Sequence, residues 1–401
     1  MLLILPMIYE LYINNIFWCI YTLVSISDLR QLKILNCVHR NVKLYSNCVA
    51  KVTNDNESFT TSYMQKWFPK IETYECDSHF YFGNDYADIL NGSLMNHLQR
   101  LAFTGMIYID LNNLPPTLTQ LSVPFCTIDT SDKSKESDCW PKNLCDLDCR
   151  EVQVKLPQTL VTFRIGNLFV GELPASVTKF STYVSHPYDF SKTNITTLFT
   201  SRDCMLPPRL EHFICRTISY YHQQSFLSLV SLNVDVIYRT DIDCLEKMSS
   251  LRELFICRIV ECSYIDFSKL QLTSLTITNK VRVKIPTTLV NLIIPSSSMC
   301  VDGPHKIRRV VISDPGLLLS DAIPLSDAIP FDHLEDLQCV TTTVNQIKNM
   351  PKLSQLTITF MNDYLIHWCA HKRIIVKTPA LNKTLAAEKQ LQYIIIKDRW
   401  L

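Results

Sequence analysis

The chain has 401 residues, of which 47% are apolar and 19% are charged, and its net charge is +1. So apolar a composition excludes a disordered chain, and the near-neutral charge argues against a nucleic-acid-binding protein that works through bulk electrostatics. Only 7 glycines occur, and none forms the glycine-rich loop that cradles phosphate groups.

Residues 1–26 are strongly apolar, and their composition leaves more than one interpretation open. A secretory signal peptide is disfavoured because no basic residue precedes Arg30. A membrane anchor would need about 20 apolar residues, and this stretch is interrupted near its middle by Glu10, Asn14 and Asn15. The remaining interpretation is a pair of short amphipathic helices, because apolar residues recur there at helical spacing.

The same segment resembles an F-box motif. The residues that carry the resemblance are Leu5, Pro6, Ile13, Ile16, Leu23 and Ile26. The resemblance implies short helices over residues 1–40 that bind the Skp-type adaptor of a ubiquitin ligase. The sequence departs from the family because no acidic residue follows Leu5-Pro6 and the usual Trp-Arg pair is absent. A plain hydrophobic cap for the repeats that follow is the competing interpretation.

From residue 68 onward the chain repeats an apolar pattern, which is clearest over Leu156–Ile165 as L-P-x-x-L-x-x-Φ-x-Φ, with Φ apolar. Residues 41–67 form a transition before the repeats begin. Copies recur at steps of roughly 15–22 residues, the range of leucine-rich repeats, and exceed the three needed for a stable stack. Well-formed copies are Leu118/Leu121/Val123, Leu144/Leu147/Cys149, Leu160/Phe163/Ile165, Leu229/Leu232/Val234, Leu251/Leu254/Ile256, Leu272/Leu275/Ile277, Leu289/Leu292/Ile294 and Leu353/Leu356/Ile358.

Each copy predicts one short strand. Its last two apolar residues are two positions apart, so they face the same side of a strand, and the first turns the chain into it. The proline before many copies blocks helix formation. The pattern resembles leucine-rich repeats of the Leu-Pro-x-x-Leu, FNIP-like subtype over residues 68–360. The resemblance implies an α/β solenoid that is a right-handed superhelix, with one continuous parallel sheet and a mostly non-helical convex side. The asparagine that the family carries after the strand is mostly missing.

The pattern fades after residue 360, and residues 361–401 are expected to cap the solenoid. The segment Tyr393–Lys397 is a predicted last strand. Solenoids require such caps because a terminal repeat has no neighbour on one side.

Sixteen cysteines occur, and several fill the last apolar position of a repeat, among them Cys149, Cys215 and Cys339. A small hydrophobic residue belongs there, so we expect buried free thiols rather than a disulfide framework or a metal site. Unpaired thiols suit a reducing compartment, so a cytoplasmic or nuclear location is expected.

No catalytic constellation is recognisable, so we expect neither an enzyme, nor a cofactor, nor a metal site. Asp146 and Asp148 share one side of a predicted strand, and we interpret them as part of a solvated face. The residues that flank the second apolar position should line the concave face of the sheet, and they include Arg164, Phe199, His212, Ile214, Arg216, Asn233, Asp235, Glu253, Phe255, Ile293, Arg309 and Val311.

Among these concave-face residues, Phe199, Ile214 and Phe255 are apolar where polar residues are usual. An apolar group rimmed by Arg216, Asp235 and Glu253, with Arg164 and His212 also on the concave face, predicts a protein-binding patch. The alternative is a one-residue slip of these repeats, which would turn Phe199 or Phe255 into the core.

These observations predict a non-catalytic protein-binding scaffold. More specifically, they predict an F-box-like substrate receptor that holds a Skp-type adaptor with its N-terminal segment and a substrate on the concave face. The alternative is a membrane-anchored recognition protein with residues 1–26 as its anchor. Neither prediction includes a nucleic-acid partner.

Overall fold

The structure is a computed structural model of the whole chain. It describes residues 10–13, 34–37, 51–54, 73–76, 97–103, 108–129, 139–167, 169, 171–182, 189–201, 204–218, 226–279, 281–294, 301–302, 306–312, 332–339, 347–348, 350–358, 365, 368–369, 371–378 and 394–396. The chain divides into two compact units, Met1–Pro207 and Pro208–Leu401. The division falls inside the predicted repeat region 68–360.

Strands, and not helices, occupy the described residues near the N-terminus. Strand β1 (Glu10–Ile13) pairs in parallel with β2 (Ile34–Cys37), with Glu10 opposite Ile34. The predicted helix is therefore wrong at Glu10–Ile13. A strand partner some twenty residues further on supplies the hydrogen bonds that a helix would have made locally, and helical spacing of apolar residues could not reveal that partner.

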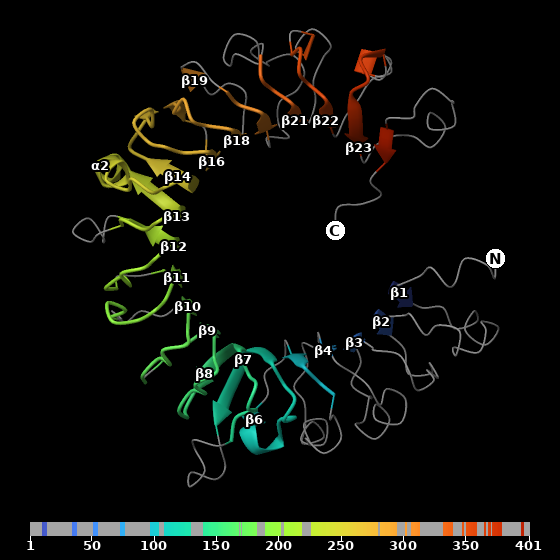
Figure 1. Ribbon diagram of the computed structural model, residues 1–401, viewed down its shortest axis with the longest axis vertical. Coiled ribbons are helices and arrows are strands. Elements are labelled where there is room, and N and C mark those ends of the chain that lie inside the picture. The colour runs from blue at the N-terminus through green and yellow to red at the C-terminus, as the bar shows by residue number, and fades with distance from the viewer. Residues whose placement is uncertain are drawn as a thin grey trace, which may run out of the picture. The chain divides into compact units, whose positions relative to one another are not determined.

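The first unit contains a parallel sheet in which each strand belongs to one coil of a solenoid (Figure 1). Strands β7, β8, β9, β10 and β11 pair in that order. Their parallel alignment confirms the predicted architecture of stacked coils. The strands are β3 (Lys51–Asn54), β4 (Thr73–Cys76), β5 (Arg100–Phe103), β7 (Gln120–Asp129), β8 (Asp146–Val152), β9 (Thr162–Ile165), β10 (Lys179–Thr182) and β11 (Thr197–Thr200).

Strand β7 is longer than its neighbours and pairs with two partners on one side. Its first residues pair with β5, and its last, Thr127–Asp129, pair with β6 (Tyr108–Asp110), which precedes a 3-10 helix at Leu111–Asn113. The register between β7 and β8 shifts between Val123 and Thr127, where the chain turns from the main sheet toward the far side of the coil. By far side we mean the side that lies across the core from the main sheet.

The second unit repeats this design, again with parallel pairing throughout its main sheet. The strands follow one another along a curved row in Figure 1. They are β12 (His212–Thr217), β13 (Ser231–Tyr238), β14 (Glu253–Val260), β16 (Ser274–Ile277), β18 (Asn291–Ile294), β20 (Arg309–Ile312), β21 (Asp336–Cys339), β22 (Gln355–Ile358), β23 (Ile375–Thr378) and β24 (Ile394–Ile396).

Two features of the second unit concern its helix and its C-terminal end. A short helix α2 (Ile242–Glu246) follows a 3-10 turn (Arg239–Asp241). Strand β24 confirms the predicted last strand.

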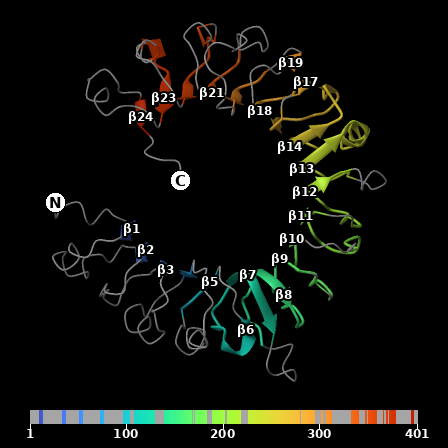
Figure 2. The ribbon, with the colours of Figure 1, turned by 180° about the vertical axis from the view of Figure 1, so that it is seen from behind.

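A second, smaller parallel sheet forms on the far side of the second unit. It consists of β15 (Tyr264–Asp266), β17 (Arg282–Lys284) and β19 (Val301–Asp302), of which β17 and β19 are labelled in Figure 2. The sequence predicted a single sheet, so this one is an addition. Its buried residues, Ile265 and Val283, alternate with polar ones over only three positions, which is too short a run to signal a strand.

The repeated apolar residues form the core, as predicted. Leu160, Phe163 and Ile165 have relative exposures of 0%, 0% and 2%, and every described member of the other copies named above is also buried. The strands that carry Phe199 and Phe255 also have the predicted register. In each strand the residues on either side of the phenylalanine are buried, whereas the phenylalanine itself is only half-buried. The alternative of a one-residue slip is therefore wrong.

The turn before each strand explains the recurrent Leu-Pro-x-x-Leu. The backbone N–H of Leu160 donates to the carbonyl of Pro157 at 3.2 Å, which closes a β-turn, and Leu289 does the same to Pro286. The hydroxyl of Thr159 then donates to the carbonyl of Leu144 in the preceding coil at 2.7 Å. Equivalent bonds run from Thr117 to Leu98, Ser176 to Leu160, Ser228 to Leu210 and Thr288 to Leu272.

Candidate binding surface

The face of each main sheet that points away from the core, here called the open face, carries the side chains that could meet a partner. Along β12 to β22, buried and partly exposed residues alternate, as in β18, where Leu292 and Ile294 are buried while Asn291 and Ile293 are half-buried. Because the strands pair in register, equivalent residues of successive coils form straight rows across the open face.

One row in the second unit is rich in apolar residues. Asn233 lies opposite Ile214 and Phe255, Thr276 lies between Phe255 and Ile293, and Val311 follows Ile293. All six residues are half-buried. Apolar side chains thus occupy every second strand from β12 to β18, about 10 Å apart at the usual strand spacing. We call Ile214, Phe255, Ile293 and Val311 the apolar row.

Charged residues flank the apolar row on both sides. His212 and Glu253 lie toward the beginning of their strands, and Arg216 and Asp235 lie toward the end; all four are exposed. Within the described part of the chain, neither Arg216 nor Glu253 forms an ion pair. These two charges are therefore available to a partner.

One of the flanking charges, Asp235, interacts with Cys257 on the neighbouring strand β14. The Cys257 thiol interacts with the Asp235 carboxylate, and burial together with this neighbouring negative charge raises the pKa of Cys257. The Thr278 hydroxyl donates to the carbonyl of Cys257 at 2.5 Å. At neutral pH the thiol therefore keeps its proton, and Asp235 contributes a negative charge to this edge of the surface.

The open face becomes ionic further along the second unit. Arg309 on β20 lies 3.4 Å from Asp336 on β21, and Arg308 lies 3.9 Å from Glu335. One oxygen of Asp336, Oδ1, is buried without a hydrogen-bond partner, whereas Oδ2 accepts the contact from Arg309. The apolar row thus ends in a paired, largely neutral region.

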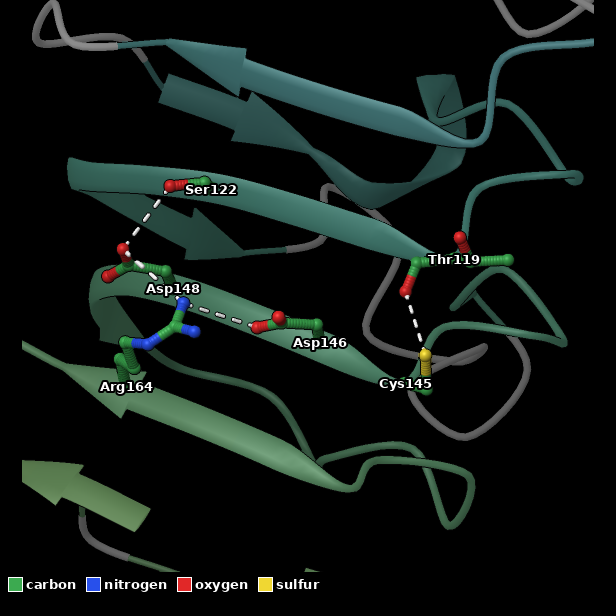
Figure 3. A network of polar contacts seen from close by, with 6 residues as sticks. All are labelled: Thr119, Ser122, Cys145, Asp146, Asp148 and Arg164. Carbon is green, nitrogen blue, oxygen red and sulfur yellow. Dashed lines mark hydrogen bonds and ion pairs between the residues drawn. The ribbon is translucent and has the colours of Figure 1, made fainter. Parts of the chain in front are cut away.

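The open face of the first unit carries a polar cluster (Figure 3). Arg164 on β9 places Nη1 3.3 Å from Asp146 Oδ1 and 3.9 Å from Asp148 Oδ2, both on β8. On the other side of β8, the Ser122 hydroxyl donates to Asp148 Oδ2 at 3.2 Å. Three neighbouring strands are linked in this way. The two aspartates do not form a bare carboxylate pair of the kind that acid–base catalysis needs, because Arg164 lies against both.

Partial burial determines the protonation behaviour of Asp148. Burial raises the pKa of this carboxyl, and the charge of Asp146 adds to the effect. Arg164 and the Ser122 hydroxyl oppose the shift without cancelling it.

The structure separates the predicted patch into parts. Ile214, Arg216, Asp235, Glu253 and Phe255 lie together on β12–β14, as does His212. Phe199 lies on β11 of the first unit, opposite Ser181, and Arg164 belongs to the polar cluster. Ile293 and Val311, which the sequence placed on the concave face but not in the predicted patch, join the row; strand register was the missing information. Of the predicted adaptor residues, Ile13 lies in β1, and Leu5, Pro6, Ile16, Leu23 and Ile26 lie outside the described residues.

The described residues bring together no group of three or more histidine, cysteine or acidic side chains that could hold a metal ion. Among the helices of the described segments, none combines the length and the apolar character needed to cross a membrane. The cysteines in these segments are free thiols, and those in the last apolar position are buried, with Cys149 at 0% and Cys339 at 5% exposure.

A scan of the sequence against protein-family models finds no matching family, and no curated protein matches it.

Proposed function

We propose that the protein is a non-catalytic scaffold that holds a protein partner on the open face of its second unit. The observation that carries this proposal is the apolar row, in which Ile214, Phe255, Ile293 and Val311 are only half-buried on an ordered sheet. Large apolar side chains in an aligned, partly solvated row favour association with another apolar surface. The charges of Arg216 and Glu253 beside the row would orient the partner.

The spacing of the row favours a helical segment lying across the strands. Ile214, Phe255 and Ile293 recur at about 10 Å, and two turns of an α-helix rise by about 11 Å. Asn233 and Thr276 lie between them and would meet polar residues at the intervening turns. The partner we propose is therefore an amphipathic helix with an apolar residue at every second turn toward the sheet.

Two finer proposals concern the class and the cellular role of the chain. The L-x-x-L-x-Φ copies on short parallel strands support membership of the leucine-rich-repeat class, with a right-handed superhelix. A role as an F-box-like receptor of a Skp-type adaptor is supported only by the sequence pattern of residues 5–26, and a cytoplasmic or nuclear location only by the unpaired thiols. The strand at Glu10–Ile13 weighs against the F-box-like role, because the resemblance implies helix there.

Site-specific photo-crosslinking tests the proposed surface in cells. A photoreactive phenylalanine analogue replaces Thr276, which lies beside Phe255 in the row, or Tyr264 on the far side, which is 43% exposed. We expect a discrete crosslinked protein from position 276 and none of the same mass from position 264. Equal crosslinking from both positions would contradict the proposal. For the finer role, full-length chain and a Leu5→Ser/Pro6→Ser variant are compared for binding to a purified Skp-type adaptor.

A further inference from the structure

A cavity of about 710 Å³ lies on the far side of the first unit, between two successive coils. One wall is the segment 151–158, which continues β8, and the other is formed by Phe169 and residues 171–175 of the next coil. We call this cavity the coil groove. It is distinct from the open face, because it lies beyond the end of β8 where the chain has turned away from the main sheet.

The coil groove exists because β8 extends beyond the end of its partner β9 on one side, while on its other side it stays paired with β7. On the β7 side, Val152 pairs with Ile128, and the Gln153 N–H donates to the carbonyl of Ile128 at 3.0 Å. On the other side β9 ends at Ile165, and the last bond is from the Asn167 N–H to the carbonyl of Arg150 at 2.6 Å. Beyond Arg150, no described residue of the next coil pairs with this edge.

The direction of the free backbone groups follows from strand geometry. Successive residues of a strand direct their N–H and C=O groups to opposite sides, and Gln153 directs its N–H to β7. The backbone groups of Val152, the last residue of β8, therefore point into the coil groove. Val154, which follows the strand, forms no backbone hydrogen bond to a described residue, and the side chains of Val152 and Val154 are buried, at 8% and 6% exposure. An edge with unpaired groups at strand spacing is a template for a further strand.

The walls of the coil groove are fixed by packing. The Phe169 ring meets the core residue Phe163 edge-on, with ring centroids 5.3 Å apart. Gly171 packs on the same ring so closely that a Cβ atom there would lie 2.8 Å from Cζ of Phe169. On the opposite wall the Trp140 indole N–H donates to the carbonyl of Lys155 at 2.7 Å. These contacts fix each wall within its own coil.

In the second unit, strand pairing between the far-side segments of successive coils closes the corresponding gap. There the far-side segments pair directly, with Tyr264 opposite Arg282 and Val283 opposite Val301, and the Phe267 N–H donates to the carbonyl of Lys284 at 2.7 Å. The coil that follows β8 contains no equivalent far-side strand among its described residues.

We propose that the coil groove binds an extended peptide of a partner protein, which adds as one strand to the free edge of β8. The peptide main chain bonds to the backbone of Val152 and Val154, which gives affinity with little demand on sequence. Glu151, Lys155 and Glu172 line the groove and leave one negative charge in excess, so a neutral or singly basic segment fits best. This site is independent of the apolar row.

Amide hydrogen exchange of the full chain, combined with peptide selection, tests the proposal. In the free protein the amides of Val152 and Val154 should exchange at least tenfold faster than that of Gln153. Binders are then selected from a library of random nine-residue peptides displayed on phage. We expect selected peptides to slow exchange at Val152 and Val154 and to lose about tenfold in affinity on Ala175→Trp, which fills the groove. Lys192→Trp, at an exposed position elsewhere in the same unit, is the matched control and should leave affinity unchanged.

Three results would overturn the proposal. The first is slow exchange of Val152 and Val154 in the free protein, which would show that the edge is closed. The second is a selection that yields only peptides indifferent to Ala175→Trp. The third is a selection that yields no binders. None of these results bears on the crosslinking test of the open face, so the two sites are judged separately.

Discussion

The hydroxyl of Thr288 donates to the carbonyl oxygen of Leu272, which lies 2.7 Å away in the equivalent turn of the preceding coil. Four other turns named above make the equivalent bond with serine or threonine. Leucine-rich repeats were expected to use an asparagine after the strand for this purpose, and that asparagine is mostly missing here. Hydroxyl side chains just before the first leucine of each copy instead bridge one coil to the next.

Replacing Thr288 with valine should lower the free energy of unfolding by about 1 kcal/mol. The substitution keeps the shape of the side chain and leaves the carbonyl of Leu272 without its partner. Thr287→Val is the matched control, because Thr287 lies in the same turn, is exposed, and makes no hydrogen bond to a described residue. Urea unfolding of the two variants measures the difference, and equal effects would argue against the hydroxyl ladder.

The two sides of β14 should respond differently to substitution. Leu254 is 2% exposed, so Leu254→Ala should cost about 2–5 kcal/mol through the cavity that it leaves. Phe255→Asp should cost about 1 kcal/mol or less, because the side chain is half-buried on the open face. Thermal unfolding of both variants checks the prediction. A loss at Phe255 as large as that at Leu254 would place Phe255 in the core.

Much of the fold could be predicted from the sequence because each coil repeats a local rule. Leu160, Phe163 and Ile165 occupy fixed positions relative to the β-turn that precedes the strand. A turn signal followed by apolar residues at every second position is enough to predict a strand with one buried face. Cys339 could be assigned to the core by the same rule.

Other features depend on pairing partners that local patterns cannot reveal. β1 is a strand because β2 pairs with it from some twenty residues away. The polar cluster required the register that brings Ser122, Asp148 and Arg164 together from three strands. The apolar row was recognised in part for the same reason: Phe255 stood out as an unusual residue, whereas Ile293 and Val311 gained significance only from their alignment across the sheet.

The raised pKa of Asp148 predicts a stabilising substitution. The folded state holds this proton more tightly than the unfolded state, whose ordinary value is 3.8. The contribution of Asp148 to stability is therefore fully present below that pH and is lost as the pH rises through the folded-state pKa. Asp148→Asn should raise the unfolding midpoint at pH 7, and the gain should vanish near pH 3.

Asp189→Asn is the matched control for Asp148→Asn, and its expected effect on the unfolding midpoint has the opposite sign. Hydrogen bonds from the side chain and backbone of Ser191 lower the pKa of Asp189. Its ionised form therefore stabilises the fold above its ordinary pKa, and Asp189→Asn should lower the midpoint at pH 7. If both substitutions shift the midpoint in the same direction, the assignment for Asp148 is wrong.

Burial raises the pKa of Cys339 to about 12. The unfolded chain loses this proton near its ordinary value of 9.0, so stability should fall as the pH rises above that value. Cys339→Ala should be less stable by about 1 kcal/mol at pH 8, because it leaves a small cavity. Its stability should also decline less steeply between pH 9 and 11, which urea unfolding at a series of pH values measures.

The most direct test of the proposed scaffold compares partner capture by three forms of the full-length chain: wild type, Phe255→Asp and Tyr264→Asp. Tyr264 is a 43% exposed aromatic residue on the far side of the same unit, so Tyr264→Asp introduces the same charge away from the apolar row. Each form is expressed in cells with a tag, and its bound proteins are quantified by mass spectrometry. We predict that at least one protein is recovered with wild type and Tyr264→Asp and is lost with Phe255→Asp. Recovery of the same proteins by all three forms would contradict the claim that the apolar row binds the partner.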